Sequence, residues 1–137
     1  MRALIDTNVV LDMLLERDPF VEDAQAIWRA NREGRFQGYG CAITPGTVYY
    51  VAYKQTHDAK YALGLVVRIL QAFYISPVDR DVLKRALQLE MTDFEDAIQS
   101  ASAQADGLDF IITRDVKGYE KSPVKAITPA DFVKELQ

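Results

Sequence analysis

The chain has 137 residues, of which 49% are hydrophobic and 26% charged. This composition can build a hydrophobic core and excludes a disordered chain, and the length suits a single domain over residues 1–137. The single cysteine excludes an internal disulfide, and the formal net charge of −4 argues against RNA or DNA binding that relies on global positive charge.

Segments with strand-like and helix-like patterns alternate along the chain. Short apolar runs predict strands, and capping residues followed by apolar residues at helical spacing predict helices. The expected strands cover residues 3–5, 37–43, 73–78, 108–112 and 124–127. The expected helices cover residues 8–15, 18–33, 44–53, 58–70, 79–90, 92–105 and a short segment that begins at residue 128.

Several of these helices begin at a capping pattern. Asp18 and Thr44 each precede a proline, and proline is favoured in the first turn of a helix. Residues 92–95 fit the capping-box pattern, with Thr92 as the expected cap. Asp58 and Asp79 are the expected caps of the two helices between them.

Strands that are separated by helices pair in parallel and are joined by right-handed crossovers. We therefore expect an α/β fold, a three-layer sandwich with a central parallel sheet. In such sheets, ligands bind beyond the carboxyl ends of the strands, at the point where the strand order reverses. The functional residues should lie at that edge.

Acidic side chains follow two of the expected strands. Asp6 comes directly after the first strand, and Asp115 follows the strand over residues 108–112. Asp93 and Asp96 are three residues apart in the first turn of a helix, so they share one face of it. Acids that converge at one sheet edge repel one another unless a cation lies between them. Oxygen ligands without His or Cys suit Mg²⁺ or Mn²⁺, which can activate water for attack on a phosphodiester.

Each acid also has a purely structural interpretation. Asp6, Asp93 and Asp96 could be helix caps, and Asp115 could be a turn residue. Any one of these signals alone is weak. Their shared position at the carboxyl edge is what favours a metal site.

Three motifs resemble those of PIN domains, in the same order and with similar spacing. Residues 4–12, Leu-Ile-Asp-Thr-Asn-Val-Val-Leu-Asp, resemble the opening PIN motif. Residues 93–103 resemble the acidic PIN helix, and residues 111–115, Ile-Ile-Thr-Arg-Asp, resemble the last acidic strand end. The resemblance covers nearly the whole chain. It implies a PIN fold, a Mg²⁺ or Mn²⁺ site, and cleavage of single-stranded RNA to 5′-phosphate and 3′-hydroxyl ends.

The resemblance also implies roles for individual residues. The catalytic and metal-binding acids would be Asp6, Asp96 and Asp115, with Asp93 as a further ligand. The polar groups implied to support these ligands or to contact phosphate are Thr7, Asn8, Thr47 and Thr113. Many small PIN domains are toxins of the VapC type, so the resemblance implies an antitoxin protein as partner, and a homodimer is a further expectation.

One position departs from the family pattern. PIN nucleases usually carry a Glu in the helix after the second strand, and the spacing from Thr44 assigns that place to Thr47. A threonine cannot supply the charge, so we expect weaker metal binding unless Asp12 or Asp93 substitutes. Reduced or absent nuclease activity is an open alternative.

Other residues invite functional interpretations that the pattern does not favour. His57, the only histidine, and Cys41 have no catalytic partner in a recognisable motif. The tyrosines Tyr49, Tyr50 and Tyr53 are expected to pack, with base stacking as the alternative. Three lysines close to Asp115 are the candidates for a local strip that contacts the RNA backbone: Lys117, Lys121 and Lys125.

The main functional hypothesis is therefore a metal-dependent endoribonuclease. The alternative is a degenerate PIN module that binds RNA or a protein partner without cutting. A phosphotransfer domain of haloacid-dehalogenase or receiver type also keeps Asp at strand ends. The dehalogenase motif, however, has a second Asp two residues after the first, where this chain has Asn8.

The sequence shows no targeting pattern. The N-terminus lacks a basic segment followed by a long apolar run, and no stretch approaches the roughly 20 apolar residues of a membrane span. We expect a cytoplasmic protein without a membrane partner.

Overall fold

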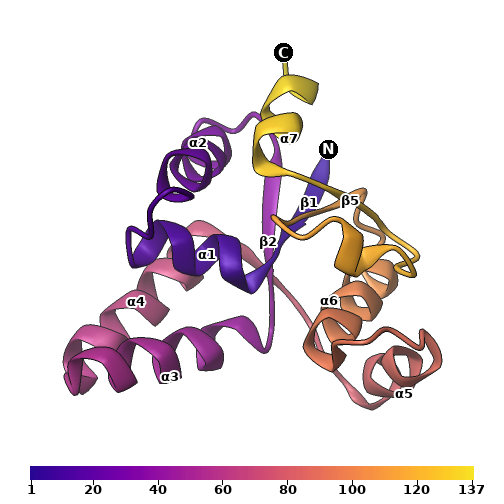
Figure 1. Ribbon diagram of the computed structural model, residues 1–137, viewed down its shortest axis with the longest axis horizontal. Helices are drawn as coiled ribbons and strands as arrows, with labels where there is room; N and C mark the ends of the chain where they lie inside the picture. The colour runs from indigo at the N-terminus through magenta and orange to yellow at the C-terminus, as the bar shows by residue number, and fades with distance from the viewer.

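The computed structural model describes residues 1–137 and contains one sheet of five parallel strands in the order β3-β2-β1-β4-β5. The strands are β1 (Arg2–Ile5), β2 (Gln37–Cys41), β3 (Tyr74–Ser76), β4 (Phe110–Ile112) and β5 (Lys125–Ile127). From β1 the chain builds outward through β2 and β3, and then returns to the other side of β1 for β4 (Figure 1). The strand order therefore reverses between β1 and β4, which is where a ligand site is expected.

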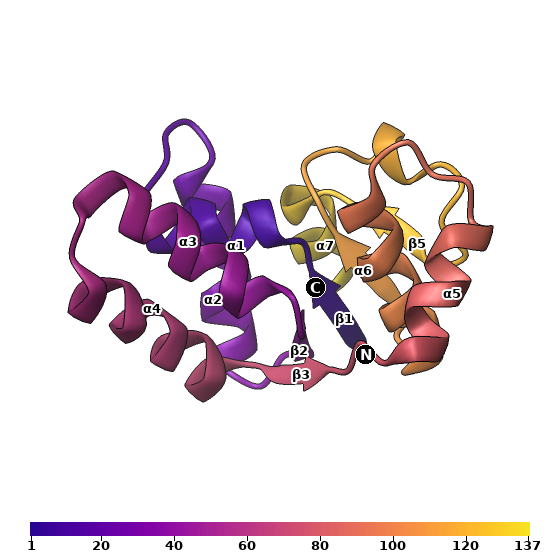
Figure 2. The ribbon, with the colours of Figure 1, turned by 90° about the horizontal axis from the view of Figure 1, so that it is seen from below.

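Seven helices and one short 3₁₀ helix connect and cover the strands. They are α1 (Thr7–Leu14), α2 (Val21–Arg32), α3 (Thr44–Thr56), α4 (Ala59–Ala72), α5 (Arg80–Gln88), α6 (Phe94–Ala105), η1 (Lys117–Tyr119) and α7 (Pro129–Glu135). Helices α1 to α4 lie on one side of the sheet, and α5 and α6 lie on the other (Figure 2). None of the helices combines the length and the apolar content that a membrane-spanning segment needs.

Alternating side chains of the central strands separate two hydrophobic cores. Ile5 of β1 and Ile112 of β4 belong to the larger core, with residues of α1 to α4 and α7. Leu4 and Ile111, their neighbours in sequence, belong to the smaller core with residues of α5 and α6. Successive residues of a strand point to opposite faces, so a strand with both faces covered is apolar throughout. The expected three-layer α/β sandwich with a parallel sheet is confirmed.

The expected elements are all present, with shifted ends. The second strand ends at Cys41 rather than residue 43, because residues 42 and 43 turn into α3. Helix α2 begins at Val21 rather than residue 18, because the Phe20 amide bonds the Arg17 carbonyl oxygen at 3.0 Å and closes a turn there. Asp18 is therefore not the cap of α2.

Two further capping expectations are wrong. Helix α3 begins at Thr44, and its hydroxyl bonds another side chain instead of capping the helix. Helix α6 is capped by Asp93, which accepts a hydrogen bond from the Asp96 amide at 3.0 Å, rather than by Thr92. The caps expected at Asp58 and Asp79 are confirmed.

Candidate active site

The ends of β1 and β4 bring Asp6 and Asp115 to the same edge of the sheet. Ile5 pairs with Ile112 in the parallel register, and the Asp6 amide bonds the Ile112 carbonyl oxygen at 2.9 Å. The Thr113 hydroxyl donates to one Asp6 carboxylate oxygen at 2.7 Å and accepts from the Asp115 amide at 3.1 Å. Thr113 therefore fixes the orientation of Asp6 relative to the loop that carries Asp115.

A buried glutamine, Gln99 of α6, holds the second oxygen of Asp6. Its side-chain amide nitrogen donates to Asp6 at 3.0 Å and also contacts the Tyr119 hydroxyl oxygen at 2.9 Å. Its carbonyl oxygen accepts from the amide and hydroxyl of Thr7, each at 3.1 Å. The hydroxyl groups of Thr7 and Thr44 form a further hydrogen bond, with 2.8 Å between their oxygens. One amide thus connects α6 to β1, α1 and η1, and Thr7 extends the connection to α3.

Asp96 joins this network through Tyr119. The Tyr119 hydroxyl donates to Asp96 at 3.2 Å. Burial, together with the carboxylates of Asp6 and Asp96, raises the pKa of Tyr119 well above its ordinary value, so the hydroxyl stays protonated. Burial raises the pKa of Asp96 to about 7, and the carboxylates of Asp6 and Asp93 add to this effect. Asp6, Asp93 and Asp96 therefore share one electrostatic environment.

A pocket of about 270 Å³ opens beside Asp115. Its lining includes Asp93, Asp96, Asp115, Lys117 and Lys121. The Asp115 carboxylate accepts a hydrogen bond from the Gly118 amide at 3.1 Å. A Cβ atom on Gly118 would collide with that carboxylate, so the close approach requires glycine.

The acids at this edge form no ion pairs. The ion pairs in the structure involve Asp12 and Asp131, and none involves Asp6, Asp93, Asp96 or Asp115, although two lysines line the same pocket. No three acidic, His or Cys side chains come close enough together to hold a metal ion between them as they stand. The carboxylates thus lie near one another without ion-pair partners, in an arrangement more open than a closed coordination shell.

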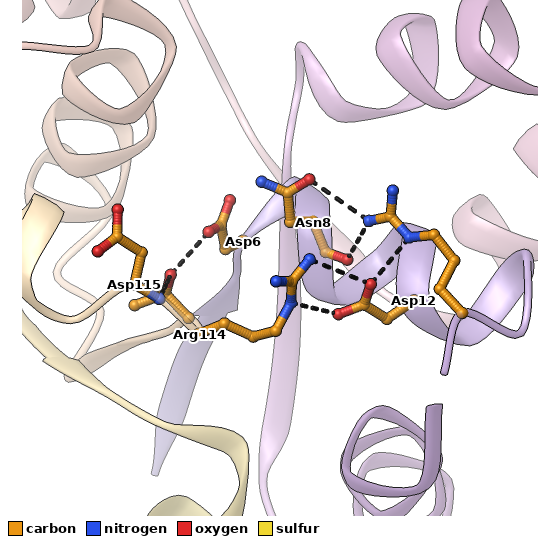
Figure 3. Close-up of polar contacts among 7 residues, drawn as sticks. Asp6, Asn8, Asp12, Arg114 and Asp115 are labelled. Atoms are coloured by element: carbon orange, nitrogen blue, oxygen red, sulfur yellow. Dashed lines mark hydrogen bonds and ion pairs between the residues drawn. The ribbon is translucent and has the colours of Figure 1, made fainter. Parts of the chain in front are cut away.

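Asp12 cannot take the place of a missing ligand. Its side chain is buried and 1% exposed, and it forms ion pairs with Arg17 at 2.9 Å and Arg114 at 2.7 Å. Two guanidinium groups already neutralise this carboxylate (Figure 3). Of the two alternatives for the missing Glu, Asp12 is disfavoured by these ion pairs, whereas Asp93 lines the pocket.

The helix after β2 contributes no acid to the site. Helix α3 contains no Asp or Glu at any position. The Thr47 hydroxyl donates to the Ile43 carbonyl oxygen of its own helix at 3.2 Å. Asn8 lies exposed, with its carbonyl oxygen accepting from Arg17 at 3.1 Å. Of the supporting residues expected from sequence, Thr7 and Thr113 are thus the two that contact the network around Asp6.

The three expected lysines do not form one strip. Lys117 and Lys121 line the pocket beside Asp115, whereas Lys125 begins β5 and pairs with Phe110, at the amino end of the strands. Cys41 is fully buried in β2, and burial raises the pKa of its thiol, which disfavours the reactive thiolate and agrees with a packing role. Tyr49 stacks on Tyr53 within α3, at a centroid distance of 5.9 Å.

Sequence patterns did not single out Gln99, Tyr119 or Arg114. Gln99 lies on the buried face of α6 and is 1% exposed, and Tyr119 is 3% exposed. An uncharged polar residue on the buried side of a helix was the available signal for Gln99, since such a group must find partners in the fold.

Replacing Gln99 with leucine should destabilise the protein. Gln99→Leu leaves an Asp6 oxygen, the Thr7 amide and the Tyr119 hydroxyl without their buried partner, so we expect the free energy of unfolding to fall by about 2–4 kcal/mol. Denaturant unfolding with a chelator present measures the change. Gln104→Leu, on the exposed side of the same helix, should change it by no more than about 0.5 kcal/mol. Equal losses in the two variants would contradict a central role for Gln99.

Comparison with known proteins identifies the family. A family model described as a PIN domain matches residues 2–117. A search of curated protein sequences finds no significant match. Among solved structures, the chain is similar to a toxin-antitoxin complex from Klebsiella pneumoniae, with 26% identity and a TM-score of 0.68. That match covers 93% of this chain and 97% of the other.

Two more distant structures share the fold. DNA-bound VapBC from Salmonella typhimurium matches with 16% identity and a TM-score of 0.73, covering 94% of this chain and 98% of the other. A sarcin-ricin loop cleaving toxin from Mycobacterium tuberculosis matches with 14% identity and a TM-score of 0.66, covering 80% and 86%. Because the family model spans the segments that carry Asp6, Asp96 and Asp115, and most of the chain besides, this protein belongs to the PIN-domain family.

Proposed function

We propose that residues 1–137 form one PIN domain that acts as a metal-dependent endoribonuclease on single-stranded RNA, as the toxin of a toxin-antitoxin pair. The observation that carries this proposal is the group of carboxylates without ion-pair partners at the switch point of the sheet: Asp6, Asp96 and Asp115. Acids without counter-charges favour a bound cation, and an all-oxygen donor set suits Mg²⁺ or Mn²⁺.

The proposed roles of the residues follow from where they lie. Asp6, Asp96 and Asp115 would hold the ion once their side chains move closer together than they lie in this structure, and Asp93 also lines the pocket. A bound Mg²⁺ or Mn²⁺ would supply an activated water and would stabilise charge on the phosphoryl oxygens. Thr113 and Gln99 each donate to one oxygen of Asp6 and so fix the direction of its carboxylate.

An antitoxin partner is proposed from the similarity to the Klebsiella pneumoniae toxin-antitoxin complex. Helix α4 provides an exposed apolar face on which a protein partner could pack, because Leu63, Val67 and Leu70 lie at helical spacing and are 56%, 50% and 56% exposed. The same face could serve in a homodimer. The antitoxin and the second copy of this chain are thus both proposed to pack on the exposed face of α4.

One observation favours the alternative of a PIN module without catalysis. Helix α3 supplies no carboxylate, and the acids do not form a closed set of three around one point. An absent ligand weakens metal binding and could abolish cleavage. The first experiment therefore separates the two functions.

We expect the protein to cut a generic single-stranded RNA when Mg²⁺ or Mn²⁺ is present and to stop when the metal is chelated. Asp6→Asn and Asp115→Asn should lower the rate by at least about 100-fold, because each removes a charge that holds the ion. Gel analysis of a labelled RNA measures the rate and the end groups. Asp81→Asn, an exposed acid on α5, is the charge-matched control and should cut like the wild type. RNA binding without any cleavage would support the non-catalytic module instead.

The affinity for Mn²⁺ should depend on pH through Asp96. Its pKa of about 7 lies above the ordinary 3.8, so the folded protein holds a proton that the unfolded chain has released. Stability from this protonated carboxyl is full below about pH 4 and is lost as the pH rises through about 7. Below about pH 7, metal must displace the proton, so affinity should rise up to about tenfold per pH unit and then level off.

Calorimetric titration with Mn²⁺ between about pH 6 and about pH 8 tests this dependence. Asp96→Asn should bind Mn²⁺ more weakly and should lose the pH dependence over that range. An affinity that is the same at both ends of the range in the wild type would place the ion away from Asp96.

Restoring a carboxylate on α3 should strengthen metal binding. Thr47→Glu adds an acid at the place assigned from sequence, and Tyr50→Glu adds one three residues further, on the same side of the helix. We expect one of the two to bind Mn²⁺ about tenfold more tightly and to cut RNA faster, with little change in unfolding free energy. Gln71→Glu on α4 controls for the added charge. If neither variant gains affinity over this control, α3 does not face the metal site.

A further inference from the structure

A pair of arginines lies on the side of Asp115 away from the acidic pocket. Arg17, after α1, and Arg114, after β4, both bind the carboxylate of Asp12. Asp12 is 1% exposed, whereas each arginine side chain is 32% exposed. One buried carboxylate therefore orients two guanidinium groups that reach the surface, and the three side chains together carry a net charge of +1.

Both arginines have hydrogen-bond donors to spare. The Asp12 carboxylate accepts a hydrogen bond from the Nε–H of each arginine. It also accepts a longer one from Arg114 Nη2 at 3.3 Å. The Arg17 Nη2 group donates to the carbonyl and side-chain oxygens of Asn8. The Nη1 groups of both arginines have no partner in the structure. A guanidinium that is held in place with free donors is suited to an anion with several oxygens.

The pair lies next to the proposed catalytic acids. Arg114 and Asp115 are neighbours in sequence, and their side chains point in opposite directions, Arg114 across to Asp12 on α1 (Figure 3). The Arg114 guanidinium also lies 3.7 Å from the centre of the Phe20 ring, which limits its freedom further. A pocket of about 200 Å³, lined in part by Asp12, Phe20 and Arg114, adjoins this group.

We propose that Arg17 and Arg114, oriented by Asp12, bind a backbone phosphate of the RNA adjacent to the phosphodiester that is cut. This inference rests on the proposed nuclease function and names a second contact point for its substrate. The RNA would run along the carboxyl edge of the sheet, from the acidic pocket on the α6 side to the arginine pair on the α1 side. In a chain of net charge −4, such a local cation offsets the repulsion between the acidic edge and the RNA.

The lysines are weaker candidates for this contact. Lys121 donates to the Glu90 carbonyl oxygen at 3.3 Å, and Lys125 lies at the amino end of β5. Neither is fixed by a buried carboxylate. The arginine pair has lost much of its side-chain freedom before RNA binds, so a phosphate contact there costs less conformational entropy.

Binding of a fluorescent single-stranded RNA of mixed sequence tests the proposal. Fluorescence anisotropy is measured at several salt concentrations, with Ca²⁺ in place of Mg²⁺ and again with chelator. We expect Arg17→Gln and Arg114→Gln each to weaken binding about tenfold and to reduce the magnitude of the salt slope by about 0.7, the value for one lost phosphate contact on a single strand. Arg29→Gln, an exposed arginine on α2, is the matched control and should bind RNA like the wild type.

Further readouts separate RNA binding from a structural role. Mn²⁺ affinity and unfolding free energy show whether a variant keeps its fold and its metal site. Arg17→Gln leaves Arg114 to neutralise Asp12, so it remains informative if Arg114→Gln is unstable. Arg17→Lys keeps the charge and should retain most of the salt slope. In cleavage assays, Arg17→Gln should raise KM more than it lowers kcat.

Each outcome decides the matter. If the wild type binds and cuts RNA while both arginine variants match Arg29→Gln, the arginine proposal is overturned and the nuclease function stands. If the wild type binds no RNA under any condition, both proposals fail together. If the variants bind RNA normally but lose an antitoxin, the arginine pair is a contact for a protein partner, and the RNA proposal is overturned.

Discussion

The arrangement of the acids at the carboxyl edge of the sheet depends on one buried amide. Gln99 contacts the carboxylate of Asp6 and the hydroxyl of Tyr119 with its nitrogen, and it accepts two hydrogen bonds from Thr7 with its oxygen. A buried carboxylate needs donors, and a neutral amide supplies one without cancelling the charge. Asp6 is therefore held in one direction by uncharged donors, and no cationic side chain pairs with it. An arginine at the same place would have oriented Asp6 and neutralised it.

Two acids of the α1 segment, one at its N-terminus and one near its end, have opposite kinds of hydrogen-bond partner. Asp6, before the first residue of α1, has only uncharged donors and faces other acids. Asp12, near the end of the same helix, is neutralised by Arg17 and Arg114. The first arrangement favours binding of an external cation, and the second leaves a small positive surplus for an external anion. The spacing between the acidic edge and the arginine pair is thus set in part by the length of one short helix.

The absence of an acid on α3 gives this PIN domain a more open site. Thr44 links α3 to Thr7 through a hydroxyl pair rather than through charge. The helix is therefore tied to the network around Asp6 without contributing a ligand. In the proposed nuclease, a smaller set of carboxylates would bind a metal ion more weakly and leave more of the edge accessible to RNA.

The sequence alone predicted the α/β class, the parallel sheet and the place of Asp6 and Asp115 at the carboxyl ends of strands, because the periodicity of strands and helices is a local signal. That β1 and β4 lie side by side is decided by the tertiary structure. The sequence did not reveal that Gln99 and Tyr119 join those acids, or that Asp12 is paired with Arg17 and Arg114. The longest of those contacts joins Arg114 to Asp12, which are 102 positions apart in the chain. Hydrogen-bond and ion-pair partners at such separations are chosen by how the helices pack on the sheet, which only the tertiary structure decides.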